Sequence, residues 1–205
     1  MTEPQWYWTP FDDPWAEDPT TNLIYLRRLF EQPEFLTSAY SRAQVAQGLW
    51  FLAAGTFSGY TKYLSDPVIP WPIRKDTIAS IPQLFRHLFA AQCGDTLGHL
   101  DRRGDDPLCT CCYMWWDIFP ANGGIDIFPT GGEEELIDAF LAAMSAILLL
   151  PSEACQESAL HGLGHAAERF PDRVKPIIDE FLARQPKISE ELKQYALRAR
   201  EGSIL

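Results

Sequence analysis

Apolar residues recur every three to four positions over most of the chain, which is the spacing of one face of an α-helix. The pattern begins at Thr21, with leucines on one side and arginines on the other, and it ends at Pro33. A second helical segment follows Ser41 and stops near Gly55, because serine is a favoured N-cap and glycine a favoured C-terminal stop. A short third helix is predicted from Ser58 to Leu64.

The middle of the chain combines one helical stripe with segments rich in proline and glycine. Residues 66–72 contain three prolines, which predict an extended connector. The helical stripe that follows contains Pro82, which fits only near the start of a helix or at a kink. Residues 94–132 carry few periodic positions apart from an apolar run at 108–119, which is compatible with helix or strand. We therefore expect a loop-rich, irregular insertion there.

The C-terminal third has the most regular pattern. Apolar residues from Leu136 to Leu148 form a wide face, typical of a central helix, and Pro151 ends it. Ser152 and Ser189 are placed to cap later helices. Because the turns between these helices are short, neighbouring helices should run antiparallel. The pattern predicts an all-α fold of stacked antiparallel helix pairs, with any strand confined to residues 125–128.

The same apolar stripes predict the core. Each expected core residue lies on the inner face of its predicted helix. These residues are Leu49, Trp50, Leu88, Phe140, Met144, Ile147, Leu160, Leu163, Ile178 and Phe181.

The chain is predicted to form a single domain over residues 1–205. A chain of this length buries roughly 70% of the surface that it exposes when unfolded, which suffices for one core. Residues 1–20 are rich in proline, tryptophan and aspartate and are expected to form an extended arm packed on the body. Helical regions at 21–93 and 133–205 flank the insertion at 94–132.

One segment, residues 153–184, carries a family resemblance. It contains the stretch ESALHGLGH, from Glu157 to His165, and then FPDRVKPIIDEFL, from Phe170 to Leu182. This order of a helix rich in small residues, a short turn and a second helix with Val-x-Pro near its start resembles one HEAT repeat. The resemblance implies a HEAT-like α–α superhelix. The two glycines within ESALHGLGH cost helix propensity, and close approach of neighbouring backbones would explain them.

The net charge of the chain limits the kinds of molecule that it is expected to bind. The sequence has 28 acidic and 17 basic residues, giving a formal net charge of −11 and a pI near 4.7. Such a field repels phosphate backbones and anionic lipids and attracts basic surfaces. We expect a protein partner with a basic surface, and neither nucleic acid nor a membrane.

Local sequence features favour a cytoplasmic location. The first residues lack the basic start and apolar run of a secretory signal. The longest apolar stretch, 139–150, is shorter than the roughly 20 residues that span a bilayer. The chain has 5 cysteines, an odd number without the spacing of a disulfide framework, which fits free thiols in a reducing compartment.

Two groups of residues are candidate metal ligands. His161 and His165 stand one helical turn apart, and Cys155 precedes them. A catalytic zinc helix usually carries a glutamate after its first histidine, whereas this one has a glycine, so the sequence favours histidines that line a groove between helices. Cys109, Cys111 and Cys112 form the second group, but their spacing strains a tetrahedron and favours buried thiols.

Signatures of catalysis are missing from the sequence. It contains no G-x-S-x-G nucleophile elbow, no phosphate-binding P-loop and no dinucleotide fingerprint. We therefore predict no catalytic residue and no cofactor. A metal- or thiol-dependent enzyme or sensor, using the histidine pair or the Cys109–Cys112 cluster, remains the alternative.

Tryptophans beside acidic residues suggest a contact surface. Trp71 lies between prolines, and the adjacent Trp115 and Trp116 precede Asp117. If the backbone there is extended, at least one of the adjacent rings must point away from the core. Exposed aromatic rings rimmed by acids are typical hot spots for a basic partner, although the same rings could pack the arm against the body.

A small, acidic helical domain without catalytic motifs is similar in character to the immunity proteins that neutralise bacterial toxins. That resemblance implies a non-catalytic protein that binds a basic toxin domain. A general adaptor that binds peptides in a groove is an alternative non-catalytic function.

Overall fold

The fold is described by a computed structural model, which covers residues 18–54, 58–100, 106–119, 134–185 and 187–204. Within these ranges it contains eleven α-helices, short 3₁₀ and π segments and no strand. The all-α prediction is therefore confirmed. The N-terminal arm up to residue 17 and the predicted strand at 125–128 lie outside the described residues.

The helices follow one another through short connections. The N-terminal elements are α1 (Pro19–Glu31), α2 (Glu34–Ala39), α3 (Arg42–Ala53), η2 (Tyr60–Ser65), α4 (Trp71–Leu84), η3 (Phe85–Phe89) and α5 (Ala90–Cys93). The C-terminal elements are η4 (Gly98–Leu100), α6 (Pro107–Tyr113), α7 (Trp115–Ile118), α8 (Glu134–Leu148), α9 (Glu153–Ala167), α10 (Pro171–Arg184) and α11 (Glu190–Arg200).

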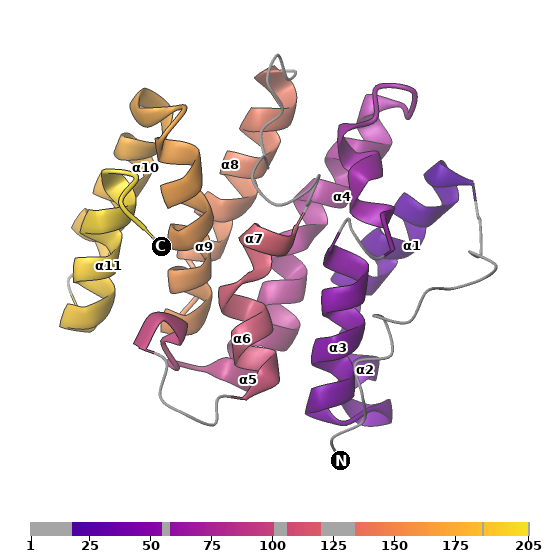
Figure 1. The fold of residues 1–205 in the computed structure, drawn as a ribbon, viewed down its shortest axis with the longest axis horizontal. Helices are drawn as coiled ribbons and strands as arrows, with labels where there is room; N and C mark the ends of the chain where they lie inside the picture. The colour runs from indigo at the N-terminus through magenta and orange to yellow at the C-terminus, as the bar shows by residue number, and fades with distance from the viewer. Residues whose placement is uncertain (1–17, 55–57, 101–105, 120–133, 186, 205) are drawn as a thin grey trace.

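The helices stand side by side and progress along the long axis of the molecule in approximate chain order (Figure 1). Helix α1 packs against α4, α4 against α8, and α8 against α9. Helices α10 and α11 pack against α9 and against each other at the C-terminal end. Each apolar stripe is thus covered by a neighbouring helix, as a stack of helices requires.

Local caps explain where the N-terminal helices begin. Asp18 accepts a hydrogen bond from the backbone N–H of Thr21 and Pro19 is the first residue of α1, so this helix starts two residues before the predicted Thr21. Ser41 caps α3 as predicted, and with Gln44 it forms a reciprocal capping box.

Helix α4 begins earlier than the sequence predicts. The expected connector at 66–72 ends at Pro70, because Pro72 lies in the first helical turn, where no backbone N–H is needed. The helix then continues through Pro82, which removes one backbone hydrogen bond. Three residues later the hydrogen-bonding pattern widens to the π-helix η3, and α5 continues it to Cys93.

The predicted insertion at 94–132 contains two short α-helices and the 3₁₀ helix η4 in its described part. Asp106 accepts hydrogen bonds from the backbone N–H groups of the first turn of α6, and Pro107 is its first residue. Helix α7 follows almost immediately. Both helices pack against α9, and most of their apolar side chains are buried. The expectation of an irregular, loop-rich insertion is therefore wrong for residues 107–118.

Helix α9 is the most enclosed element of the described fold. Every residue from Ala154 to Gly164 is buried, because helices α6, α7, α8, α10 and α11 all contact it. Among the predicted core residues, Trp50 is only partly buried, and it packs on the edge of the core. The other nine are buried, namely Leu49, Leu88, Phe140, Met144, Ile147, Leu160, Leu163, Ile178 and Phe181.

The glycines of α9 make room for side chains of neighbouring elements. A Cβ atom on Gly162 would lie 2.6 Å from Cγ of Trp116, and one on Gly164 would lie 2.6 Å from Cδ1 of Ile204. The predicted close approach is thus real, but it is made by side chains and not by a neighbouring backbone. In the described part of the chain, no helix is both long and apolar enough to cross a membrane.

Candidate metal centre

Helix α7 places its tryptophans in the core. Trp115 and Trp116 are each 1% exposed. Trp115 stacks on Phe119 with ring centroids 5.0 Å apart, and Trp116 stacks on Phe85 at 6.3 Å. The prediction of an exposed tryptophan here is wrong, because it assumed an extended backbone. In a helix, successive side chains differ in direction by about 100°, so both rings reach the same core.

The next residue, Asp117, points away from those rings and toward α9. Its Oδ2 lies 2.8 Å from Nε2 of His161, and its Oδ1 lies 2.7 Å from Nε2 of His165. One carboxylate therefore bridges two histidines that stand one helical turn apart. Its side chain is 24% exposed, so the bridge lies at the edge of the core.

The two histidines converge on one point. Their Nε2 atoms lie 3.2 Å apart, as the i, i+4 spacing on α9 allows. The His161 side chain is 1% exposed and that of His165 is 36% exposed. The pair is therefore anchored in the core at one end and reaches solvent at the other.

A second layer of hydrogen bonds orients His161. Its Nδ1 atom lies 2.5 Å from the hydroxyl of Tyr195 on α11. That hydroxyl lies 3.4 Å from the hydroxyl of Tyr113, at the end of α6. Metal-binding histidines commonly use their second ring nitrogen in this way, which fixes the ring and leaves the first nitrogen for the ion.

Burial and hydrogen bonding set the protonation of this cluster. Burial raises the pKa of Asp117, but hydrogen bonds from His161 and His165 outweigh burial and hold its pKa below the ordinary aspartate value. Burial raises the pKa of Tyr195 well above its ordinary value, and Tyr113 adds to the rise. At neutral pH the cluster thus combines neutral phenols with an ionised carboxylate, which is the form of a carboxyl group that binds a metal ion.

One turn before His161, α9 carries a second buried acid. Glu157 accepts hydrogen bonds from the backbone N–H groups of Gly98 at 2.6 Å and His99 at 3.1 Å, and it also pairs with the His99 ring. The rings of His99 and Tyr195 lie 4.7 Å apart. These contacts tie the segment after α5 to α9 and α11.

The spacing of the two histidine nitrogens fits a single transition metal ion, whereas the Asp117 oxygens stand at hydrogen-bond distance from those nitrogens, closer than two ligands of one ion. The coordinating atoms of Asp117, His161 and His165 all lie within 4.8 Å of one another, and this is the one such group of three among the described residues. Zn–N bonds of about 2.0–2.1 Å place two ligand atoms of one ion about 3.0–3.4 Å apart. The 3.2 Å between the histidine Nε2 atoms falls in that interval.

The remaining predicted site residues lie elsewhere. Cys155, the third weak metal candidate, is buried and directs its thiol to the carbonyl of Phe85. Six residues before His161 correspond to about 600° of helix, so it occupies another face of α9. Trp71 is half-buried at the start of α4, with the Arg74 guanidinium over its ring.

The Cys109–Cys112 cluster is separate from the histidine pair. Cys109, Cys111 and Cys112 are free and buried, as the sequence favoured. Within the described chain they join no group of three metal ligands.

Asp117 was recognised in the sequence for a different role. Its place after two tryptophans suggested a contact surface, whereas its carboxylate is held by histidines 44 and 48 residues away. Local periodicity carries no information on such a pairing. If residues 115–118 are taken as helical, Asp117 points away from the two core-facing tryptophans. That direction is the only local indication of its contact with the histidines.

Comparison with protein-family models finds no match for this sequence. Comparisons with curated proteins and with solved structures also return no match.

Proposed function

We propose that this protein is a helical domain that binds one divalent transition metal ion, such as zinc, through Asp117, His161 and His165. The observation that carries the proposal is the convergence of two imidazole nitrogens and one carboxylate from two different helices on one partly exposed point. Two histidines and one carboxylate form a donor set that zinc and non-haem iron use in proteins.

Three protein ligands leave the ion at least one open coordination position. Structural zinc sites are closed by four protein ligands, whereas sites that bind water or substrate keep three. The exposed fractions of Asp117 and His165, 24% and 36%, support an open position that faces solvent. The proposed function is therefore to present an ion with an exchangeable ligand, and an ion of this kind acidifies bound water.

The scaffold of this site is proposed to be a HEAT-like repeat. Helices α9 and α10 correspond to the resembling segment 153–184, and their packing against each other supports this assignment. In this proposal the repeat supplies the rigid helix α9, and the shorter α7 supplies the carboxylate. Ligands fixed on packed helices are held more precisely than ligands on loops.

The basic protein partner, whether toxin or peptide, remains a prediction from the sequence. The aromatic part of its expected surface is lost with the burial of Trp115 and Trp116. Asp117 is engaged by the histidines, and Trp71 is only partly exposed. The net charge of −11 is the remaining support for a basic partner.

Cobalt substitution tests the metal proposal. The full chain is stripped of metal, kept reduced and titrated with Co²⁺ while visible absorption is recorded. We expect one ion per chain with the absorption of nitrogen and oxygen ligands and without the near-ultraviolet band of a thiolate ligand. Added azide should change the visible spectrum, because it enters the open position.

Matched histidine variants locate the bound ion. His165→Gln should abolish the cobalt spectrum, whereas His87→Gln should preserve it, since His87 lies on the surface beside Glu34. A spectrum that survives His165→Gln, or that shows a thiolate band, would overturn the proposal. A circular dichroism spectrum of each variant verifies that the helices are intact.

A further inference from the structure

Two cysteines from neighbouring helices meet where α5 packs against α6. Cys93 is the last residue of α5, and Cys109 lies in the first turn of α6. Cys93 is 5% exposed and Cys109 is 8% exposed, whereas the remaining thiols are fully enclosed. One terminal nitrogen of Arg42 contacts both segments, because it donates to the carbonyl of Gln92, the residue before Cys93, and to the sulfur of Cys109. This pair is therefore the one that a small solute reaches most easily among the cysteines.

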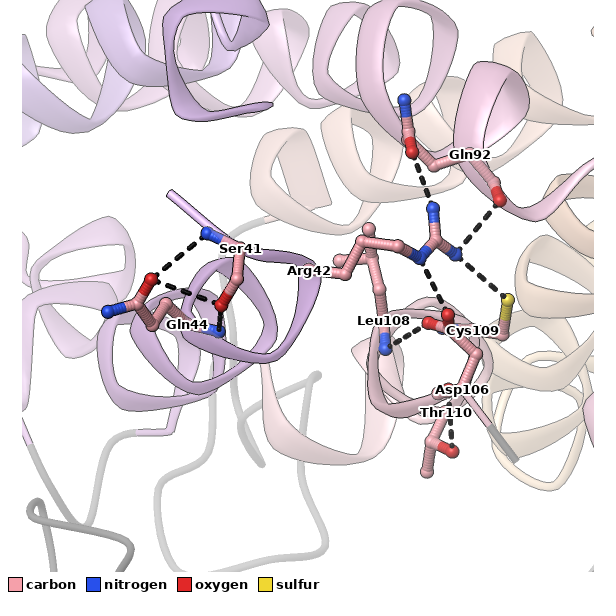
Figure 2. A network of polar contacts seen from close by, with 8 residues as sticks. All are labelled: Ser41, Arg42, Gln44, Gln92, Asp106, Leu108, Cys109 and Thr110. Carbon is pink, nitrogen blue, oxygen red and sulfur yellow. Dashed lines mark hydrogen bonds and ion pairs between the residues drawn. The ribbon is translucent and has the colours of Figure 1, made fainter. Parts of the chain in front are cut away.

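Arg42 places a fixed positive charge beside this pair (Figure 2). Its Nε donates to Oδ2 of Asp106 at 2.6 Å, and its terminal nitrogens donate to the side chain and the backbone carbonyl of Gln92. The remaining contact of the guanidinium is with the sulfur of Cys109, at 3.9 Å. Four contacts hold the guanidinium in place, so its charge acts on the thiols from a defined position.

These surroundings favour a thiolate. Hydrogen bonds from Cys109 and Cys112 lower the pKa of Cys93 to about 5, aided by the charge of Arg42 and opposed by burial and by Asp106. The hydrogen bond with Cys93 raises the pKa of Cys109, and burial raises it further. Of the two thiols, Cys93 is therefore the one that loses its proton first.

We propose that Cys93 and Cys109 form a peroxide-sensitive pair that closes to a disulfide. In the first step the Cys93 thiolate attacks one oxygen of hydrogen peroxide, the O–O bond breaks, and hydroxide leaves and takes up a proton to become water. Cys93 becomes a sulfenic acid. In the second step the Cys109 sulfur attacks the Cys93 sulfur, the S–S bond forms, the S–O bond breaks, and the leaving hydroxide takes up the Cys109 proton to become a second water.

Cys109 is the resolving partner because of its position relative to Cys112. Both thiols lower the pKa of Cys93, but Cys112 is fully enclosed and directs its sulfur to the carbonyl of Ala154. Cys109 has exposed surface and a direct contact with Arg42, which stabilises the thiolate that attacks the sulfenic acid. The disulfide would join the end of α5 to the start of α6.

Peroxide oxidation followed by mass spectrometry tests the pair. The full chain is reduced, treated with chelator to remove metal from the separate histidine site, and exposed to hydrogen peroxide at pH 7. We expect a loss of two hydrogens per chain and a cross-link between the tryptic peptides that contain Cys93 and Cys109. Cys93→Ser should give no cross-link. Cys109→Ser should instead leave a sulfenic acid at Cys93 that dimedone traps.

Three further variants keep the proposal falsifiable. Cys112→Ser should still form the cross-link. Arg42→Gln retains every thiol and should slow oxidation at pH 6 by about tenfold, because the Cys93 thiolate loses its neighbouring cation. Arg27→Gln, which removes a surface arginine paired with Glu31 and Asp76, should leave the rate unchanged.

Two results would overturn the proposal. One is oxidation of Cys93→Ser at the rate of the original protein. The other is a cross-link in Cys109→Ser that runs through Cys112. Because metal is absent throughout, neither result depends on the proposed metal function.

Discussion

The carboxylate of Asp117 is hydrogen-bonded by two histidines. Each of its oxygens contacts a different histidine, at 2.8 Å and 2.7 Å. The cost of its partial burial is offset by these bonds, so it stays ionised. At the scale of single residues, the proposed centre depends on this charge and on the ring orientation of His161.

Removing the hydroxyl of Tyr195 tests how His161 is oriented. In Tyr195→Phe the Nδ1 atom of His161 loses its partner, and we expect zinc affinity to fall by about 10- to 100-fold, as for other outer-shell partners of metal-bound histidines. Tyr113→Phe is the matched control, since its hydroxyl contacts Tyr195 and no histidine. Competition with a chromophoric chelator gives both affinities, and equal losses in the two variants would contradict the assignment.

Asp106 predicts a pH dependence of stability. Burial raises its pKa, but hydrogen bonds from Arg42 and the backbone of Leu108 outweigh burial, so its pKa lies below the ordinary value. A folded-state pKa below the unfolded value of about 3.9 stabilises the fold above that pH, and the contribution is lost as pH falls through the folded-state pKa. Asp106→Asn retains an N-cap residue but removes this contribution.

Urea unfolding of Asp106→Asn measures this effect. The difference in unfolding free energy between the original protein and the variant should be larger at pH 7 than at pH 3. An equal difference at both values would mean that the charge of Asp106 is not what stabilises the start of α6.

At the scale of elements, α7 packs closely on α9 because Gly162 has no side chain. The Trp116 ring lies where a side chain on position 162 would be, and Asp117 follows directly on the same short helix. The close packing of α7 on α9 therefore fixes the distance from the carboxylate to the histidines.

Gly162→Ala tests this fit. In an open helix the change to alanine stabilises by about 1 kcal/mol. Here the new Cβ would meet Trp116 at 2.6 Å and Met144 at 3.0 Å, both inside the core. We expect a net loss of about 1–3 kcal/mol in unfolding free energy, together with weaker metal binding.

Gly48→Ala on α3 is the matched control for that change. Its Cβ would meet nothing within 4 Å, so the variant should be as stable as the original protein or more stable. The same helix-propensity gain applies to both sites. Thermal unfolding that ranks Gly162→Ala equal to or above Gly48→Ala would contradict the packing of α7 against α9.

At the scale of the whole molecule, periodicity was enough to predict the long helices and most of the core. Wide apolar stripes, such as that of α8, leave few alternatives to a buried helix. The short helices α6 and α7 escaped prediction because four to seven residues show less than two turns of periodicity. Asp106-Pro107 was the available signal, since it combines an N-cap with a favoured first residue.

The candidate site was predictable only in part. The histidine pair follows from its spacing on one helix, but the carboxylate comes from an element 44 residues away in the chain. The assembly of that triad depends on how the stack of helices brings α7 onto α9. The same holds for Cys93 and Cys109, which meet only because α5 and α6 pack together.

Zinc binding measured by titration calorimetry tests the central claim most directly. The full chain, reduced and free of metal, is compared with Asp117→Asn, which keeps the shape of the side chain and removes its charge. The account predicts one zinc ion per chain in the original protein and an affinity at least about a hundredfold weaker in the variant. Equal zinc affinity in the two proteins would contradict it.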